Sequence, residues 1–187
     1  MQLRRQAVPD FTDKPIKYVH EGITFLAAGH YYKDNNQSIA KLLKNGDKYA
    51  IEYATHKMVP LLDNERSLVL VPMPGHHGKA EQTLDLCRSL SDATGFPVCD
   101  VLRGYDRISN YEAKKNGTPL TETQLGLRMM DRLPSGCIPA VVDNVADTGV
   151  SAKAAIHALG RGFVLTFAIT DFMMQQEERI ASKAFHR

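Results

Sequence analysis

The sequence of 187 residues has no tryptophan, only three cysteines and no long hydrophobic run. No apolar stretch approaches the ~20 residues that a membrane-spanning helix needs. The N-terminal segment is basic, but no apolar core of the kind found in signal peptides follows it. We therefore expect no membrane association and no secretion signal.

The cysteines, Cys87, Cys99 and Cys137, are widely spaced. They form no C-x-x-C pair and indicate no disulfide framework. Free thiols are typical of a reducing compartment, so the pattern favours a cytoplasmic protein. The formal net charge of +2 is too small to indicate nucleic acid or a membrane surface as the main partner.

The periodicity of the apolar residues predicts a single α/β domain. We expect an irregular arm over 1–14 and one or two strands, or a hairpin, over 16–32. Further strands are predicted over 67–75, 97–102, 137–143 and 163–170, and helices over 35–46, from Asp47 onward, and over 79–95, 149–160 and 173–185. Alternating strands and helices are typical of a Rossmann-like parallel sheet.

In such sheets ligands bind beyond the carboxyl ends of the strands, which selects the loops 72–79 and 143–151. In the second loop, the amides of 147–151 can converge at a helix N-terminus and bind an anion. Asp143 and Asn144 precede them and can accept hydrogen bonds from sugar hydroxyls. A phosphorylated sugar fits both features. The alternative is an ordinary turn with a helix cap at its end.

The stretch AVVDNVADTGVS (140–151) resembles the phosphoribosyl-diphosphate (PRPP) signature of the type I phosphoribosyltransferases. The resemblance implies that Asp143 and Asn144 hold the ribose hydroxyls, with Asp143 acting through a metal-bound water and Mg²⁺ as the cofactor. It also implies that Asp147 acts on the accepting base. Asn144 departs from the family pattern, which has Asp or Glu there. The implied phosphate-binding residues are Ala146, Asp147, Thr148, Gly149, Val150 and Ser151.

The loop after the 67–75 strand corresponds in position to the family's pyrophosphate loop. Its candidate residues are Pro74, Gly75, His76, His77 and Lys79. A Gly/Pro turn with two exposed histidines is the plainer alternative, and a metal site at His76 and His77 is less favoured because no third ligand is evident.

The long polar stretch 103–132 corresponds to a loop that closes over the diphosphate in the family. Loops of this length are usually functional or disordered. Its candidate diphosphate contacts are Arg103, Lys114 and Lys115, and it also carries Arg107 and Arg128. The alternative is a solvated charged surface.

The order of the segments is similar to that of the competence-associated, amidophosphoribosyltransferase-like branch. The resemblance implies a hood over 1–64, a PRPP-binding core over 65–170, a C-terminal helix over 171–187 and a homodimer. The implied reaction transfers phosphoribosyl from PRPP to a nitrogen nucleophile, a purine-like base or an amine, and releases pyrophosphate. A regulatory module that binds PRPP or a nucleotide without turnover is the alternative. Tyr31, Tyr32 or Phe172 could stack on the acceptor ring, although core packing is the stronger expectation for each.

Overall fold

The computed structural model describes residues 14–62, 67–171 and 173. Residues 1–13 of the arm predicted over 1–14, residues 174–185 of the helix predicted over 173–185, and Phe172 lie outside the described residues. None of the helices in the described part of the chain combines the length and apolar character needed to cross a bilayer.

Strands and helices alternate along most of the chain. In order they are β1 (Ile16–His20), β2 (Ile23–His30), α1 (Asn36–Lys44), α2 (Lys48–Met58), a short 3-10 helix (Val59–Leu61), β3 (Leu68–Pro72), α3 (Gln82–Thr94), β4 (Leu102–Arg103), α4 (Asn110–Lys115), α5 (Glu122–Leu125), β5 (Arg128–Met129), β6 (Ile138–Ala146), α6 (Val150–Leu159) and β7 (Phe163–Ile169).

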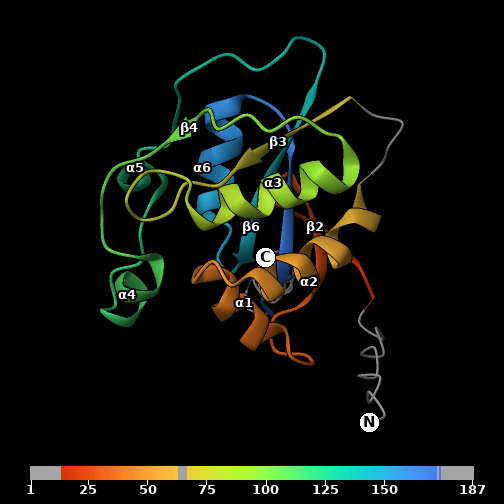
Figure 1. Ribbon diagram of the computed structural model, residues 1–187. Coiled ribbons are helices and arrows are strands. Elements are labelled where there is room, and N and C mark those ends of the chain that lie inside the picture. Colours follow the sequence, from red (N-terminus) through yellow and green to blue (C-terminus); the bar gives the residue numbers. More distant parts are fainter. Residues whose placement is uncertain (1–13, 63–66, 172, 174–187) are drawn as a thin grey trace, which may run out of the picture.

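The main sheet has five strands in the order β1-β2-β7-β6-β3. Only β1 is antiparallel to its neighbour, and the other pairs are parallel. Helices α1, α2 and α3 lie on one face of the sheet and α6 lies on the other (Figure 1). The fold is thus α/β with a mostly parallel sheet flanked by helices, compatible with the predicted Rossmann-like class.

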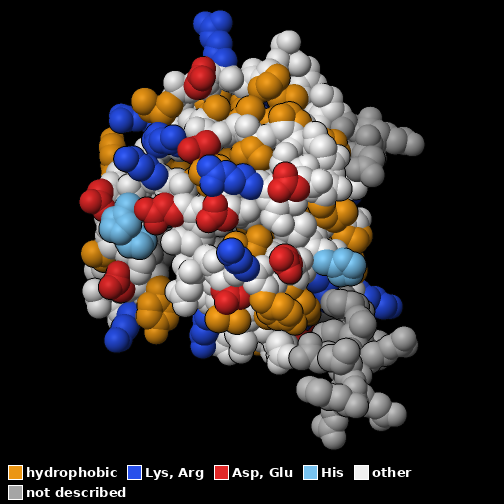
Figure 2. All heavy atoms as spheres, in the orientation of Figure 1, with side chains coloured by type: hydrophobic (Ala, Val, Ile, Leu, Met, Phe, Trp, Pro, Cys, Tyr) orange, Lys and Arg blue, Asp and Glu red, His pale blue; other side chains and the backbone are white. Residues whose placement is uncertain are grey.

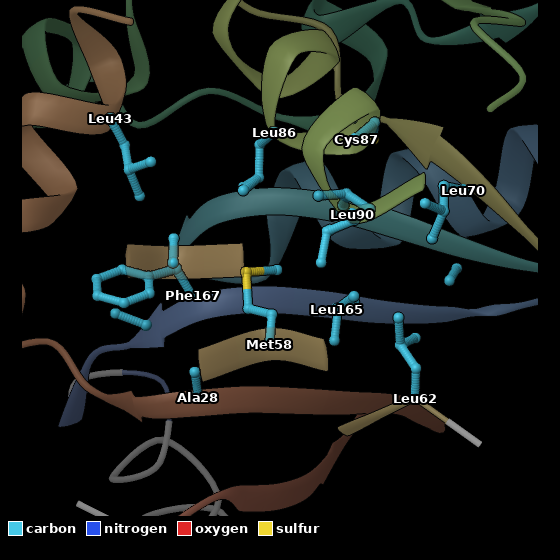
Figure 3. Close-up of a cluster of buried hydrophobic side chains, with 14 of the residues drawn as sticks. Ala28, Leu43, Met58, Leu62, Leu70, Leu86, Cys87, Leu90, Leu165 and Phe167 are labelled. Atoms are coloured by element: carbon cyan, nitrogen blue, oxygen red, sulfur yellow. The ribbon is translucent and has the colours of Figure 1, made fainter. Parts of the chain in front are cut away.

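One hydrophobic core lies between the sheet and helices α1–α3. In Figure 3, Met58 and Leu90 project from the helices toward Leu70, Leu165 and Phe167 of the strands. These five side chains are at most 1% exposed. Strand β3 is buried along its whole length, as expected of a strand covered on both faces.

The second core lies between the sheet and α6. Val71, Val141 and Val164 point to this face and pack in the same cluster as Ala152 and Ala155 of α6. Small side chains on α6 let the helix axis approach the sheet. This packing fixes the direction of the helix whose first turn follows β6.

Several local predictions are confirmed. Residues 16–30 form the antiparallel hairpin of β1 and β2. Asp47 caps α2 by accepting a hydrogen bond from the amide of Ala50 at 2.9 Å. Gly95 and Gly160 end α3 and α6 in the left-handed conformation. The three cysteines are free thiols.

The strand predicted over 97–102 is wrong in extent. Only Val98 pairs with the sheet, in a single bridge to Leu70. The amide of Val101 bonds back to the carbonyl of Cys99 at 3.0 Å, which turns the chain away from the sheet edge. Leu102 and Arg103 instead pair with β5 in a separate two-stranded ribbon.

Two boundaries also differ from the predictions. Helix α3 begins at Gln82, because residues 75–78 are engaged in a turn in which the amide of Gly75 bonds to the carbonyl of Lys79. Strand β6 continues to Ala146 instead of ending at 143. Its last residues stay in register with β7, with Asp143 opposite Thr166.

Residues 16–62, which fall in the segment expected to form a hood, are continuous with the main sheet and its first core. Strand β2 pairs with β7, and β1 forms the edge. Helices α1 and α2 contribute Leu43 and Met58 to the core beside α3. On the face seen in Figure 2, basic and acidic side chains are interspersed, in keeping with the small net charge.

Candidate functional site

The strand order places the two predicted loops side by side. From β3 the chain crosses to Val98, on the outer side of β3, and then returns to β6 on the inner side. The direction of winding therefore changes between β3 and β6. Ligands of open α/β sheets bind at such a switch point, beyond the carboxyl ends of the strands.

The turn at 147–151 leads from β6 directly into α6. In the part of the chain that is described, only one amide of this turn finds a protein acceptor: Val150 N lies 3.5 Å from Thr148 Oγ1. The amides of Asp147, Thr148, Gly149 and Ser151 have none. Exposed amides at the start of a ten-residue helix favour an anion.

Gly149 is the residue that makes this turn possible. Its φ is +79°, a conformation that side chains rarely adopt. A Cβ added there would lie 3.2 Å from Cδ2 of His20, whose side chain is buried behind the turn. Glycine therefore serves both the backbone angle and the close approach of β1. No pattern in the sequence indicates that His20 lies there.

Asp143 lies inside β6 rather than beyond its end. Its Oδ1 accepts a hydrogen bond from the amide of Asn144 at 2.7 Å. Burial raises the pKa of Asp143 to about 6, against the smaller opposing effects of the Asn144 amide, Lys44 and the Val145 amide. A carboxyl group in this setting is ready to gain a cation or hydroxyl donors.

Asn144 is buried, with only 6% of its surface exposed. Its Oδ1 has no hydrogen-bond donor in the described structure. An unsatisfied buried carbonyl costs about 1–3 kcal/mol. The sequence predicts that Asn144 faces a sugar, but in the structure its side chain is buried inside the protein. Its Oδ1 is nevertheless able to accept a hydrogen bond.

The loop after β3 holds its predicted residues in different environments. Pro74 is buried, whereas Gly75, His76, His77 and Lys79 are exposed. The two histidine rings lie 4.0 Å apart, and His77 Nδ1 lies 3.1 Å from Asp106 Oδ1. This contact is with an acid of the long polar segment.

The segment 104–116 joins both loops. Its first part bonds to the β3 loop: the amide of Gly104 donates to Gly78 O and that of Arg107 to His76 O, each at 2.9 Å. Gly78 has a φ of +73°, and a Cβ there would overlap the carbonyl of Gly104. The two backbones therefore cross in direct contact.

The second part of this segment reaches the turn after β6. Asn110 Nδ2 donates to Ser151 Oγ at 2.9 Å, and Lys114 Nζ lies 2.9 Å from Asp147 Oδ2. Thr170 Oγ1 donates to the other oxygen, Oδ1, of Asp147 at 2.8 Å. Helix α4 consequently lies against the candidate phosphate loop.

Three basic residues of the stretch 103–132 are predicted to contact the diphosphate, namely Arg103, Lys114 and Lys115. Of these, only Lys114 forms a hydrogen bond or ion pair with either loop in the described structure. The guanidinium of Arg103 is bound to both carboxylate oxygens of Asp100, at 2.6 and 2.9 Å. In the structure Arg103 is therefore paired with an acid of its own part of the chain, and its predicted contact with a diphosphate stays a prediction. Lys115 is exposed on α4.

Sequence reasoning missed Asn110 and Thr170 as neighbours of the site. A signal for α4 was nevertheless present, since Ser109 and Glu112 form a capping box that begins the helix. No comparable signal exists for Thr170, because its contact with Asp147 depends on the pairing of β6 with β7.

Two of the three acceptor-stacking candidates, Tyr31 and Tyr32, follow the end of β2. Tyr31 packs against the first core, while Tyr32 is 65% exposed. Their rings meet edge to face at 4.9 Å. The prediction of core packing therefore fits Tyr31 better than Tyr32.

The described residues contain no cluster of three or more His, Cys, Asp or Glu side chains that could bind a metal unaided. His76 and His77 thus have no third protein ligand in that part of the chain. No protein-family model matches the sequence, and no curated protein matches it either. The function is therefore inferred from the geometry of the site and from the resemblance of residues 140–151 to the PRPP signature.

Proposed function

We propose that this protein binds PRPP at the carboxyl ends of β3 and β6 and transfers the phosphoribosyl group to a nitrogen nucleophile, with release of pyrophosphate. The observation that carries the proposal is the set of four amides, those of Asp147, Thr148, Gly149 and Ser151, that have no acceptor among the described residues. These amides come immediately after β6, the strand that contains Asp143. An anion-binding turn next to a carboxylate suits a phosphate joined to a polyhydroxyl ring.

The 5′-phosphate would bind the amides of Thr148, Gly149 and Ser151 and the hydroxyl groups of Thr148 and Ser151. Two further features support an anion here. The dipole of α6 adds partial positive charge at this end, and Lys114 lies at the rim of the turn, at 2.9 Å from Asp147.

The ribose would lie toward β6, where Asp143 can accept hydrogen bonds from its hydroxyls. Asn144 Oδ1, which lacks a donor among the described residues, is a second acceptor at the adjacent position. Its use by a ligand or by a water would require access past the surrounding side chains. The amide group brings no charge, so Asp143 would supply the negative charge on its own.

The residues present are compatible with Mg²⁺ held by one carboxylate. Mg²⁺ is commonly bound by one or two carboxylates together with substrate phosphates and water, and it does not need a cage of protein ligands. Asp143 forms no salt bridge within the described residues, and burial raises its pKa to about 6. When bound, Mg²⁺ would offset the negative charge that develops on the leaving diphosphate.

Asp147 is the residue positioned to handle a proton. Thr170 and Lys114 fix its two carboxylate oxygens in one orientation. A carboxylate so oriented can accept a proton from the attacking nitrogen once Lys114 moves toward the diphosphate. The segment 104–116, which contacts both loops, would exclude water from the reacting carbon.

A binding module without turnover is the second candidate. Two observations favour it: Asn144 stands where the family has an acid, and Lys114 already neutralises the candidate proton acceptor. Such a protein would bind PRPP or a nucleotide and pass the signal through segment 104–116.

The test is calorimetric titration with PRPP and Mg²⁺, followed by an assay of pyrophosphate release with a panel of purine-like bases and amines. Binding with release for at least one acceptor supports the transferase. Binding with no release for any acceptor supports the binding module. Absence of binding to PRPP, ribose 5-phosphate and nucleoside monophosphates would reject both.

A further inference from the structure

We propose that Arg107 is an oxyanion-binding residue, and that together with the β3 loop it binds the diphosphate end of the ligand. Arg107 differs from Arg88 and Arg103, which are bound to Asp85 and Asp100. Its only side-chain hydrogen bond within the described structure is from Nη1 to the carbonyl of Ile108, at 3.3 Å.

The guanidinium of Arg107 is half-buried and has no counter-ion within the described residues. Its Nε is buried and has no acceptor, and no carboxylate pairs with it in the described part of the chain. Burial lowers the pKa of Arg107 from its usual value. Arginine nevertheless stays protonated, so a partly desolvated guanidinium with an unused, buried Nε–H is stabilised by an incoming anion.

The neighbouring acids are already engaged. Asp106 lies 3.1 Å from His77, and Glu112 accepts hydrogen bonds from the amide and hydroxyl of Ser109. Neither carboxylate is therefore well placed to neutralise Arg107. The missing partner is more readily supplied by a ligand than by this protein segment.

The position of Arg107 relates it to the phosphate loop. Its own amide bonds to His76, while Asn110, three residues later, bonds to Ser151. Three residues span at most about 10 Å, so Arg107 Cα lies within about 10 Å of Asn110 Cα. A ligand with one phosphate at 147–151 and a second oxyanion group nearby could therefore engage both ends of this stretch.

A diphosphate suits the planar guanidinium, which binds phosphate oxygens through two N–H groups. The identity of the anion rests on the proposed function, but the existence of an oxyanion site at Arg107 does not. Among the basic residues of 103–132, Arg107 would then fill the role expected of Arg103.

The experiment is calorimetric titration of the full chain with inorganic pyrophosphate, and separately with ribose 5-phosphate. Arg107→Met should weaken pyrophosphate binding about 10- to 100-fold, the range for loss of a charge-assisted hydrogen bond. Ribose 5-phosphate binding should change little. Arg107→Lys should bind pyrophosphate with intermediate affinity, because it retains the charge but not the Nε–H.

Arg128→Met is the matched control, since it removes an exposed arginine from the same segment. Equal weakening by Arg107→Met and Arg128→Met would indicate general charge attraction and overturn the inference. Unchanged pyrophosphate affinity in Arg107→Met, or no pyrophosphate binding by the unmodified chain, would also overturn it. If Arg107→Met fails to fold, Arg107→Lys provides the same comparison.

The two proposals fail separately. Loss of pyrophosphate binding in Arg107→Met, in a chain that binds neither ribose 5-phosphate nor PRPP, would reject the proposed function and retain the oxyanion site. If PRPP binds and Arg107→Met leaves its affinity unchanged, the oxyanion site at Arg107 would be rejected and the proposed function would be retained.

Discussion

Lys114 and Asp147 are 33 residues apart in the sequence, yet Lys114 Nζ lies 2.9 Å from Asp147 Oδ2. Asp147 belongs to the turn that the sequence resemblance selects, and Lys114 belongs to the segment expected to close over the diphosphate. The ion pair therefore holds the segment against the turn. Both side chains are partly exposed, at 47% and 40%.

Replacing Lys114 with Met should change stability by no more than about 1 kcal/mol, because exposed ion pairs contribute little. For a chain of this size that corresponds to a shift in Tm of at most about 4 °C. Under the proposed function, PRPP affinity should fall by about tenfold as a diphosphate contact is lost. Thermal unfolding and calorimetry measure the two effects.

Lys115→Met is the control for this variant, since Lys115 is the next residue on α4 and is exposed. It should reduce PRPP affinity less than Lys114→Met. Equal losses in both variants would mean that the charge of α4 matters and the contact with Asp147 does not.

Asp143 should make stability depend on pH between about 4 and 6. Its pKa rises from 3.8 in the unfolded chain to about 6 in the fold, so the folded state binds the proton more tightly. Above pH 6 the carboxylate is charged in both states, and its burial lowers the free energy of unfolding by roughly 3 kcal/mol. As the pH falls toward 4 the folded protein becomes protonated at Asp143, and this loss of stability disappears.

The variant Asp143→Asn should lack the part of the pH dependence of stability that comes from Asp143, and it should be more stable than the unmodified chain at pH 8. Urea unfolding of both proteins at pH 4.5, 6 and 8 measures the difference in their free energies of unfolding. The other titrating groups are common to both proteins and cancel in this difference. A stability difference that is the same at all three pH values would contradict the prediction.

Gly149→Ala should destabilise the fold more than Gly160→Ala. Both glycines have positive φ, at +79° and +72°, so alanine costs about 1–2 kcal/mol at either position. At Gly149 the new Cβ would also meet the buried ring of His20, whereas nothing lies within 4 Å at Gly160. We expect an additional cost of about 1 kcal/mol or more from this crowding.

Ligand binding separates the same two variants. Gly149→Ala should weaken binding of ribose 5-phosphate because it distorts the turn, and Gly160→Ala should leave it unchanged. Titration of ribose 5-phosphate into both folded variants measures this. Undiminished binding by Gly149→Ala would show that the turn does not hold the phosphate.

Asn144→Asp should lower stability by about 2–4 kcal/mol at pH 8, because it buries a second carboxylate beside Asp143. The loss should be smaller at pH 5, where one of the two groups is protonated. The exchanged double variant Asp143→Asn/Asn144→Asp has a single carboxylate and should recover most of the stability. Urea unfolding at both pH values tests this, and recovery of none of it would contradict the charge argument.

The same Asn144→Asp variant bears on turnover. If Asn144 limits catalysis, the added acid should raise pyrophosphate release from PRPP relative to the unmodified chain. An unchanged rate in a variant that still binds PRPP would assign the limitation to another residue.

Local patterns predicted most of the elements that build the site. The apolar run of β3 and the strand, turn and helix around Gly149 were evident because burial and backbone conformation are set by nearby residues. The segment 97–102 shows the limit of this reasoning. Its apolar residues suit a strand, but a turn at Val101 takes the chain away from the sheet.

The α/β class, the loop that resembles the PRPP signature and the need for glycine at 149 could all be read from the order of the residues alone. Three other facts emerge only from the folded chain: Arg103 is bound to Asp100, Arg107 has no acid partner in the described residues, and Lys114 reaches Asp147. Hydrophobic periodicity acts over a few residues and is written into the chain locally. The partner of a charged side chain depends on where distant segments cross, and only the folded path of the chain fixes that.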